Sequence, residues 1–324
     1  MGYGLLILLL GWAVSANAAD LTAMDETAKG FSNIKTVQVA HQGQLIWSKA
    51  YNGADINDAA NIKSASKSVM SAIVGMAIDK GVIESVNVPV AEVLTDQLPA
   101  NPDPQLKDIQ VQHLLSMQAG LERTSGRNYG RWVVSDNWVK AALARPFVAQ
   151  VGGVMQYSTG NTHLLSAIVM KQSGQHTYKL ANQWFKGSGV HIESWETDPQ
   201  GIPMGGNQMG MTPFSLLAFG ELYRRGGVAA NGQRYIAEDW IKESWQPRTQ
   251  SRFHQGLYGY GWFMQEFAGV QGYYGWGYGG QMIYVFPQLA LTVAITSQEH
   301  LPSGRTGYRD ALHSMVSEYI VSVL

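Results

Sequence analysis

The sequence predicts an α/β (α+β) fold, in which an antiparallel sheet formed from both chain ends is flanked by helices and carries a largely helical inserted subdomain. Two observations predict this class. Runs typical of β-strands occur near both ends of the chain, whereas the middle has the apolar spacing of helices. The 324 residues, 45% of them hydrophobic, are enough for a large core shared by two packed subdomains.

Two strand-like runs open the folded part of the chain. They span residues 36–40 and 44–50, and His41, Gln42 and Gly43 separate them. Such a short polar connection with a glycine is the signal of a β-hairpin. We therefore expect the sheet to begin with this pair of strands.

Residues 64–80 predict a helix that is apolar on nearly every side, and Gly81 ends it. Its apolar residues are Val69, Met70, Ile73, Val74, Met76, Ala77 and Ile78. A helix that is apolar all round is a buried one. Ser64 is therefore expected to open a central, buried helix.

The middle of the chain predicts three more helices. They span residues 111–117 and 161–173, and a third begins at Thr212-Pro213 and ends at Gly226-Gly227. Thr212 is expected to be the N-cap and Pro213 the first helical residue, because proline fits that position without losing a hydrogen bond.

The last part of the chain returns to strand patterns. Strands are expected at residues 259–267, 281–286 and 291–296, with Pro287 in a turn, and a helix is expected at 308–324. We therefore assign residues 19–80 and 246–324 to an α/β domain and residues 81–245 to a mainly helical subdomain.

The N-terminus predicts export. Residues 5–14 are apolar, and Ala16 and Ala18 place small residues at the −3 and −1 positions of a cleavage site, although no Lys or Arg precedes them. We expect residues 1–18 to be a signal peptide and the mature protein to be periplasmic or secreted. No later segment predicts a transmembrane helix.

Composition excludes several classes of function. The net charge is −1 and there is no basic stripe, which argues against nucleic acid as a partner. The chain has no cysteine, so thiol catalysis and thiolate metal sites are excluded. Its histidines lack the spacing of metal ligands, and we predict no metal and no cofactor. The oligomeric state stays open.

Ser64-Ala65-Ser66-Lys67 is the first candidate for catalysis. A serine hydroxyl needs a base beside it to act as a nucleophile. Residues three apart on a helix share a face, and burial lowers the pKa of a lysine so that it can accept a proton. Ser32 and Lys35 have the same spacing, but they precede a strand and no buried helix follows them.

Two later segments complete the candidate site. Tyr157 stands in a Tyr-Ser-Thr-Gly-Asn run between helices, where its hydroxyl could relay protons or where the residue could serve packing alone. Residues 275–281, Gly-Trp-Gly-Tyr-Gly-Gly-Gln, precede a strand. Their glycines allow close approach of a ligand to the backbone, or form a tight turn.

Together these segments resemble the motifs of the serine β-lactamase and penicillin-binding family, which are Ser-x-x-Lys, Tyr-x-Asn and Lys-Thr-Gly. The likeness to the class C branch spans residues 37–296. It includes residues 111–117, 119–121, 157–168, 205–207 and 211–213.

The resemblance implies roles for individual residues. Ser64 becomes the nucleophile, Lys67 its base and Tyr157 the residue that shuttles the proton. The backbone N–H groups of Ser64 and Tyr278 become the oxyanion hole. Candidate substrate-binding residues are Thr159, Asn161, Trp276 and Gly277.

Two departures from the family pattern shape the functional hypothesis. Thr159 replaces the usual asparagine, and Gly275-Trp276-Gly277 replaces Lys-Thr-Gly. Without that lysine, which helps to bind a substrate carboxylate, we expect a serine hydrolase for small ester or amide substrates, similar to the esterases and aminohexanoate-oligomer hydrolases, unless Arg252 or Arg305 supplies the cation. The alternatives are a β-lactamase or D,D-peptidase, and a non-catalytic protein that binds β-lactams or cell-wall fragments.

Overall fold

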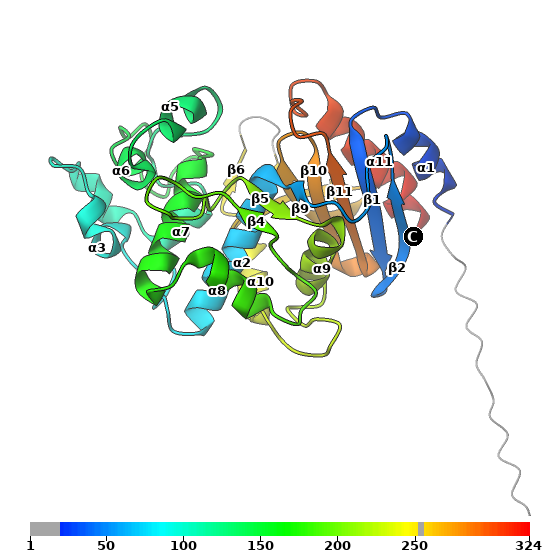
Figure 1. Ribbon diagram of the computed structural model, residues 1–324, viewed down its shortest axis with the longest axis horizontal. Coiled ribbons are helices and arrows are strands. Elements are labelled where there is room, and N and C mark those ends of the chain that lie inside the picture. The colour runs from blue at the N-terminus through cyan, green and yellow to red at the C-terminus, as the bar shows by residue number, and fades with distance from the viewer. Residues whose placement is uncertain (1–19, 252–255) are drawn as a thin grey trace, which may run out of the picture.

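An eight-stranded antiparallel sheet forms one half of the molecule in the computed structural model, which describes residues 20–251 and 256–324 (Figure 1). Its strand order is β2-β1-β11-β10-β9-β8-β7-β6. The strands are β1 (Ile34–His41), β2 (Gln44–Ala50), β6 (Thr249–Gln250), β7 (Leu257–Tyr258), β8 (Phe263–Phe267), β9 (Val270–Gly277), β10 (Gln281–Phe286) and β11 (Leu291–Ser297). Because β1 pairs with β11, both chain ends contribute to one sheet, as predicted.

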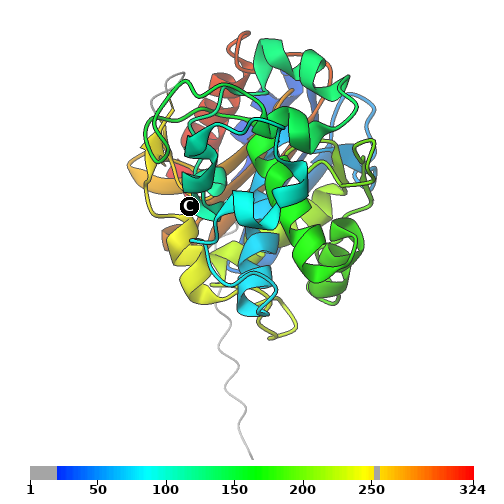
Figure 2. The ribbon, with the colours of Figure 1, turned by 90° about the vertical axis from the view of Figure 1, so that its left-hand side faces the viewer.

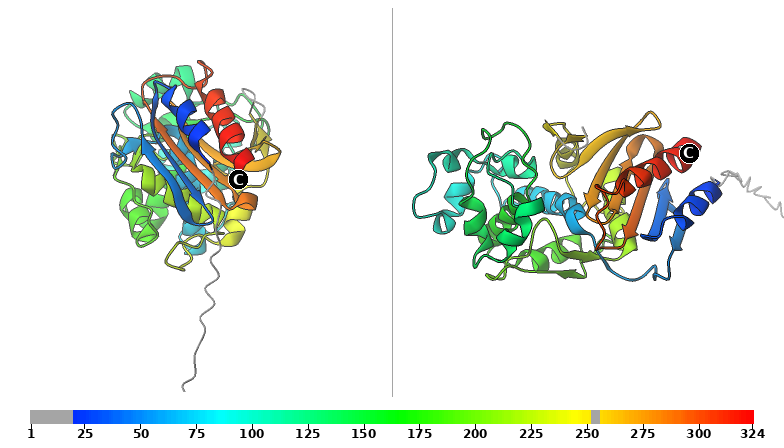
Figure 3. Two further views of the ribbon diagram at one scale, coloured as in Figure 1. Left: turned by 90° about the vertical axis from the view of Figure 1, so that its right-hand side faces the viewer. Right: turned by 90° about the horizontal axis from the view of Figure 1, so that it is seen from above.

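Helices cover both faces of this sheet. On the outer face, α1 (Thr22–Lys29) and α11 (Tyr308–Tyr319) lie side by side (Figure 3, left). On the inner face, α9 (Pro213–Arg224) packs against β1, β10 and β11. Every residue of β10 is therefore buried, which explains its continuous run of hydrophobic side chains.

The other half of the molecule is mainly helical and faces the viewer in Figure 2. Its helices are α3 (Val90–Val93), α4 (Val111–Leu115), α5 (Tyr129–Val133), α6 (Trp138–Leu143), α7 (Thr159–Ser173) and α8 (Thr177–Phe185). A further helix, α10 (Glu238–Ser244), lies near the large sheet. A small sheet has the order β3 (Ala60–Asn61), β5 (Met209–Met211) and β4 (Ser194–Trp195). Helix α7 packs against α2, α4 and α6 and forms the centre of this half.

Helix α2 (Ser66–Asp79) lies between the two halves (Figure 3, right). It contacts α7 on one side and β9 and α10 on the others. Its first twelve residues are buried, as the apolar pattern predicts. Ser64 does not open α2 itself, because the segment Lys63–Ala65 is a 3-10 turn that leads into the helix.

Other boundaries also differ from the sequence prediction. Thr212 is the N-cap of α9, and its hydroxyl accepts the Ser215 N–H at 3.1 Å, as expected. Of the strand expected at residues 259–267, only residues 263–267 form a strand, β8. Residues 259–262 are the turn that joins β8 to β7, and Gly261 in this turn has a φ of +81°. A Cβ atom on Gly261 would lie 2.7 Å from the Lys67 carbonyl oxygen, so this glycine lets the turn approach α2 closely.

Membrane-spanning segments were sought in the part of the chain that the structure describes. None of its helices has both the length and the apolar composition that crossing a bilayer requires. The expected signal peptide, residues 1–18, lies outside the described residues.

Candidate active site

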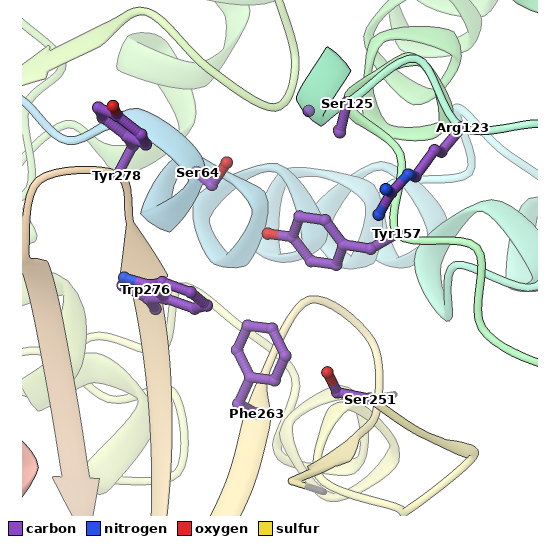
Figure 4. A pocket seen from close by; sticks show the side chains of 9 residues that line it. Ser64, Arg123, Ser125, Tyr157, Ser251, Phe263, Trp276 and Tyr278 are labelled. Atoms are coloured by element: carbon purple, nitrogen blue, oxygen red, sulfur yellow. The ribbon is translucent and has the colours of Figure 1, made fainter. Parts of the chain in front are cut away.

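A cleft of about 270 Å³ lies where the helical half meets the sheet (Figure 4). The residues that line it come from the turn before α2, the loop before α5, the segment just before α7, the end of β6, and strands β8 and β9. They are Ser64, Arg123, Ser125, Gly126, Tyr157, Ser251, Phe263, Trp276 and Tyr278. The structure therefore brings Ser64, Tyr157, Trp276 and Tyr278 together from distant parts of the sequence.

Lys67 lies directly behind Ser64 on the first turn of α2. Its Nζ is 2.9 Å from the Ser64 Oγ, and the residue is only 1% exposed. Burial lowers the pKa of Lys67 to about 7, because the charged amine loses its hydration. A lysine with this pKa has a large neutral fraction near neutral pH and can accept the Ser64 proton.

The neighbours of Lys67 orient its lone pair. The Gly206 carbonyl oxygen, 2.6 Å from Nζ, can only accept a hydrogen bond. The Thr159 Oγ1 is 3.5 Å from Nζ and is a second acceptor. When the neutral amine donates its two hydrogens to these oxygens, its lone pair faces the Ser64 hydroxyl, which is the geometry of a general base.

The loop that carries Gly206 is held close to α7. A Cβ atom on Gly206 would lie 2.0 Å from the Thr162 Oγ1 and 3.1 Å from the Lys67 Nζ. Asp198 lies in the same loop, before Gly206, and a buried hydrogen bond of 3.0 Å joins it to His163 in α7. Glycine at position 206 therefore allows the carbonyl to reach the lysine.

Tyr157 approaches Ser64 from the opposite side of the cleft, and its hydroxyl points toward Ser64 in Figure 4. Its ring stacks on Phe263, with centroids 5.9 Å apart, and lies 5.0 Å from the Lys67 Nζ. Burial raises the pKa of Tyr157, and a hydrogen bond with Ser64 partly offsets this effect. The phenol therefore keeps its proton at neutral pH and can donate or relay it.

Trp276 and Tyr278 flank the end of β9. Both line the cleft together with Ser64. That the backbone N–H groups of Ser64 and Tyr278 form an oxyanion hole stays a prediction. Gly277 lies between them without lining the cleft. A Cβ atom there would lie 2.2 Å from the Ile62 carbonyl oxygen, so glycine lets β9 pack against the segment that leads to Ser64.

Thr159 and Asn161 occupy different surroundings. Thr159 contacts Lys67 and Ser125, whose Oγ lies 3.0 Å from the Thr159 Oγ1. Asn161 is 4% exposed inside α7, and its amide nitrogen has no hydrogen-bond partner in the described part of the chain. Neither is among the residues that line the cleft, and Thr159 reaches it through Ser125.

The cleft is lined by a cationic side chain that the sequence did not indicate. Arg123, in the loop before α5, extends toward the cleft beside Tyr157 (Figure 4). Of the two arginines considered from sequence, Arg305 is exposed and does not line this cleft, and Arg252 lies outside the described residues. Loop residues such as Arg123 have no periodic pattern that could have marked them.

Metal ligands were also sought among residues 20–251 and 256–324. No group of three or more His, Asp or Glu side chains there could hold a metal ion.

The beta-lactamase family model matches residues 35–314. The chain belongs to the beta-lactamase family. This match covers most of the chain and includes Ser64, Lys67, Tyr157 and Tyr278. No curated protein matches the sequence.

Solved structures show that the chain has the fold of this beta-lactamase family. A Bacillus anthracis protein provisionally named a 6-aminohexanoate-dimer hydrolase has a TM-score of 0.74 and 18% identity, over 93% of this chain and 80% of its own. A D-stereospecific amidohydrolase from Streptomyces sp. has a TM-score of 0.71 and 14% identity, over 94% and 100%. EstCE1, a hydrolase with promiscuous acyltransferase activity, has a TM-score of 0.71 and 16% identity, over 91% and 97%.

Activity is expected to rise with pH around 7. The predicted base is the neutral form of Lys67, whose pKa burial lowers to about 7. At a pH one unit below this value, kcat/KM for a neutral ester should be about one tenth of its plateau. Measurement of kcat/KM between about pH 5 and 9 checks this, with the wild-type fold monitored by circular dichroism. A profile that is flat between about pH 6 and 8 contradicts the assignment.

Proposed function

We propose that the protein is a serine hydrolase that cleaves ester or amide bonds through an acyl-enzyme on Ser64. The observation that carries this proposal is the pair formed by Ser64 and a buried lysine of low pKa. The Lys67 Nζ lies 2.9 Å from the Ser64 Oγ, and burial lowers the pKa of Lys67 to about 7. Ser64 faces a cleft that admits a small substrate.

The reaction begins when Ser64 attacks the substrate carbonyl carbon while its proton passes to Lys67. The backbone N–H groups of Ser64 and Tyr278 stabilise the charge that develops on the carbonyl oxygen. Tyr157 donates a hydrogen bond at Ser64 and, together with Lys67, moves the protons. Water then attacks the ester at Ser64, and the same groups return the proton to the serine oxygen.

The β9 side of the cleft favours an uncharged substrate. Trp276 offers an indole where many family members have a lysine, and its ring carries no formal charge. The Arg309 guanidinium lies 4.9 Å from the centre of this ring, but it forms an ion pair with Asp310 and does not line the cleft. The printed names of the similar structures include an aminohexanoate-dimer hydrolase, an amidohydrolase and a hydrolase with acyltransferase activity. These names support an ester or amide substrate, but other similar structures carry a beta-lactamase name. The missing lysine, and not the names, therefore argues against a β-lactam.

Three substrates test the proposed function side by side. The purified protein is incubated with p-nitrophenyl butyrate, a chromogenic cephalosporin and a labelled penicillin. Fast ester turnover with slow cephalosporin turnover supports the proposal. Rapid cephalosporin turnover favours a β-lactamase, and stable penicillin labelling without turnover favours a penicillin-binding protein. Failure to react with any of the three, or with a fluorophosphonate probe, favours a non-catalytic binding protein.

Neutral short-chain esters are expected to have a higher kcat/KM than cephalosporins or D-alanyl-D-alanine peptides. A missing charged hydrogen bond at the third motif corresponds to about 1.5–3 kcal/mol of discrimination. The direct measurement compares a neutral ester with its carboxylate-bearing analogue. A clear preference for the anionic analogue contradicts the expectation, and loss of that preference in Arg123→Gln would identify Arg123 as the cation responsible.

We also propose that the protein acts in the periplasm or outside the cell. The support is the apolar run at residues 5–14 followed by Ala16 and Ala18, together with the absence of cysteine from the sequence. Cell fractionation of the native host, followed by N-terminal sequencing of the mature protein, tests this. Recovery of an uncleaved protein in the cytoplasm contradicts it.

A further inference from the structure

A row of hydroxyl groups connects the buried lysine to the cleft on the side away from Trp276. The Lys67 Nζ is 3.5 Å from the Thr159 Oγ1, which is 3.0 Å from the Ser125 Oγ. Ser125 lines the cleft, as Ser64 does (Figure 4). Ser64 and Ser125 are therefore two hydroxyl groups on the cleft wall, and each is connected to the same lysine.

We propose that Ser125 is the proton donor to the leaving group, and that Thr159 delivers this proton from Lys67. The proposal rests on the proposed acyl-enzyme mechanism and adds a second proton path to it. Tyr157 then acts at Ser64, where its hydroxyl lies, and Ser125 acts at the departing atom of the substrate.

The hydrogen-bond directions in this row follow from the donors available once Lys67 is charged. A protonated lysine can only donate, so the Thr159 Oγ1 accepts from it. The Thr159 hydroxyl then needs an acceptor, and within the described residues the Ser125 Oγ is its remaining partner. That oxygen also accepts the Thr159 backbone N–H at 2.8 Å. With both acceptor positions occupied, the Ser125 hydroxyl hydrogen is left to point into the cleft.

The longest step in the row is the 3.5 Å separation of Lys67 from Thr159. This distance suits a neutral lysine, whose N–H is a weaker donor. Charging the amine strengthens the hydrogen bond, because charge-assisted hydrogen bonds are shorter than neutral ones. Proton transfer from Ser64 to Lys67 would therefore shorten the hydrogen bond between Lys67 and Thr159. This happens at the stage when the leaving group needs a proton.

The proton balance closes over the acylation step. The Ser64 oxygen forms a bond to the carbonyl carbon and its proton passes to the neutral Lys67 amine. The bond from that carbon to the leaving group then breaks. The leaving atom takes the Ser125 proton, Ser125 takes the Thr159 proton, and Thr159 takes one from Lys67, which becomes neutral again. Nothing is oxidised or reduced, and no other reactant is needed.

Ser125 also has a structural role, and the test must distinguish it from the proposed role in proton transfer. Its Oγ and the neighbouring Thr124 Oγ1 accept backbone N–H groups at the start of α7, from Thr159 at 2.8 Å and from Gly160 at 2.7 Å. Thr124 is 2% exposed and does not line the cleft. Thr124→Ala therefore removes a comparable helix contact without removing a hydroxyl from the cleft, and it is the matched control.

The experiment compares two substrates with the same acyl group, p-nitrophenyl butyrate and ethyl butyrate. The p-nitrophenolate ion leaves without a proton, whereas ethoxide needs one. In Ser125→Ala and in Thr159→Val, kcat/KM should fall more for the ethyl ester than for the p-nitrophenyl ester, by at least about 30-fold. Ser125→Thr keeps a hydroxyl at this position and should retain most of the ethyl ester activity. Thr124→Ala should lower the activities on the two esters by a similar factor.

Two results would overturn the proposal while the acyl-enzyme mechanism stands. One is an equal loss on both esters in Ser125→Ala with the enzyme still labelled at Ser64. The other is a selective loss of ethyl ester activity in Tyr157→Phe and not in Ser125→Ala, which would make Tyr157 the donor. Failure of a fluorophosphonate to label Ser64 in the wild type would instead refute the proposed function itself.

Discussion

Ser64→Ala is expected to abolish turnover and leave the fold intact. The substitution removes one hydroxyl from a 3-10 turn at the cleft wall and leaves Lys67 without the proton that it would accept. Loss of a nucleophile removes the covalent path, so kcat for p-nitrophenyl butyrate should fall by at least about 1,000-fold. Steady-state kinetics measure this loss, and the circular dichroism spectrum and melting temperature should match those of the wild type.

The chain offers a matched control for this result. Ser32, which precedes Lys35 with the same spacing, is exposed, so Ser32→Ala should retain wild-type kinetics. A fluorophosphonate probe should modify Ser64 in the wild type and in Ser32→Ala, as mapped by mass spectrometry of tryptic peptides. Modification of Ser32 or of the buried Ser66 in place of Ser64 would show that the nucleophile has been misassigned.

Lys67→Arg is expected to be almost as damaging as Lys67→Ala. A guanidinium stays protonated at all working pH values, so it cannot take the Ser64 proton. Removal of a positioned general base costs on the order of 100-fold or more in kcat/KM. The measurement is kcat/KM for a neutral ester at about pH 8, where the wild-type lysine is mostly neutral.

Lys67→Met separates loss of the base from loss of the fold. Lys67 is 1% exposed, so a permanently charged arginine in its place has a desolvation cost that could destabilise the protein. Methionine has a similar length and no charge, and this variant should remain folded while losing activity to the same extent. If Lys67→Arg kept most of its activity, Lys67 would serve as a charge partner for the substrate or the oxyanion and not as a base.

Much of the fold could be predicted from local sequence patterns. The β1–β2 hairpin could be predicted from its short turn with a glycine, although no residue of β2 is buried. The buried helix α2 and strands β10 and β11 each have a run of apolar side chains that matches their burial. The division of residues 257–267 into β7 and β8 could not be predicted. Its cause is the close approach of Gly261 to the Lys67 carbonyl oxygen, a contact between segments almost 200 residues apart in sequence.

The same distinction applies to the candidate site. Ser64, Lys67 and Tyr157 could be proposed because their motifs are short and local, and the structure brings all three together. Arg123 and Ser125 could not be proposed. They lie in a loop without periodicity, and hydrogen bonds to the start of α7 position Ser125 at the cleft. Gly206 acts through a carbonyl oxygen, which residue identity does not mark.

The pairing of β1 with β11 determines when activity can first appear during synthesis. β1 must wait for residues 291–297 to leave the ribosome before it gains this neighbour, and β9 must wait for β10, residues 281–286. Contacts so distant in sequence form slowly and late. A nascent chain that ends within the helical half therefore holds Ser64 and Lys67 but lacks the strand beside them. The cleft can therefore form only after residues 281–297 have been synthesised.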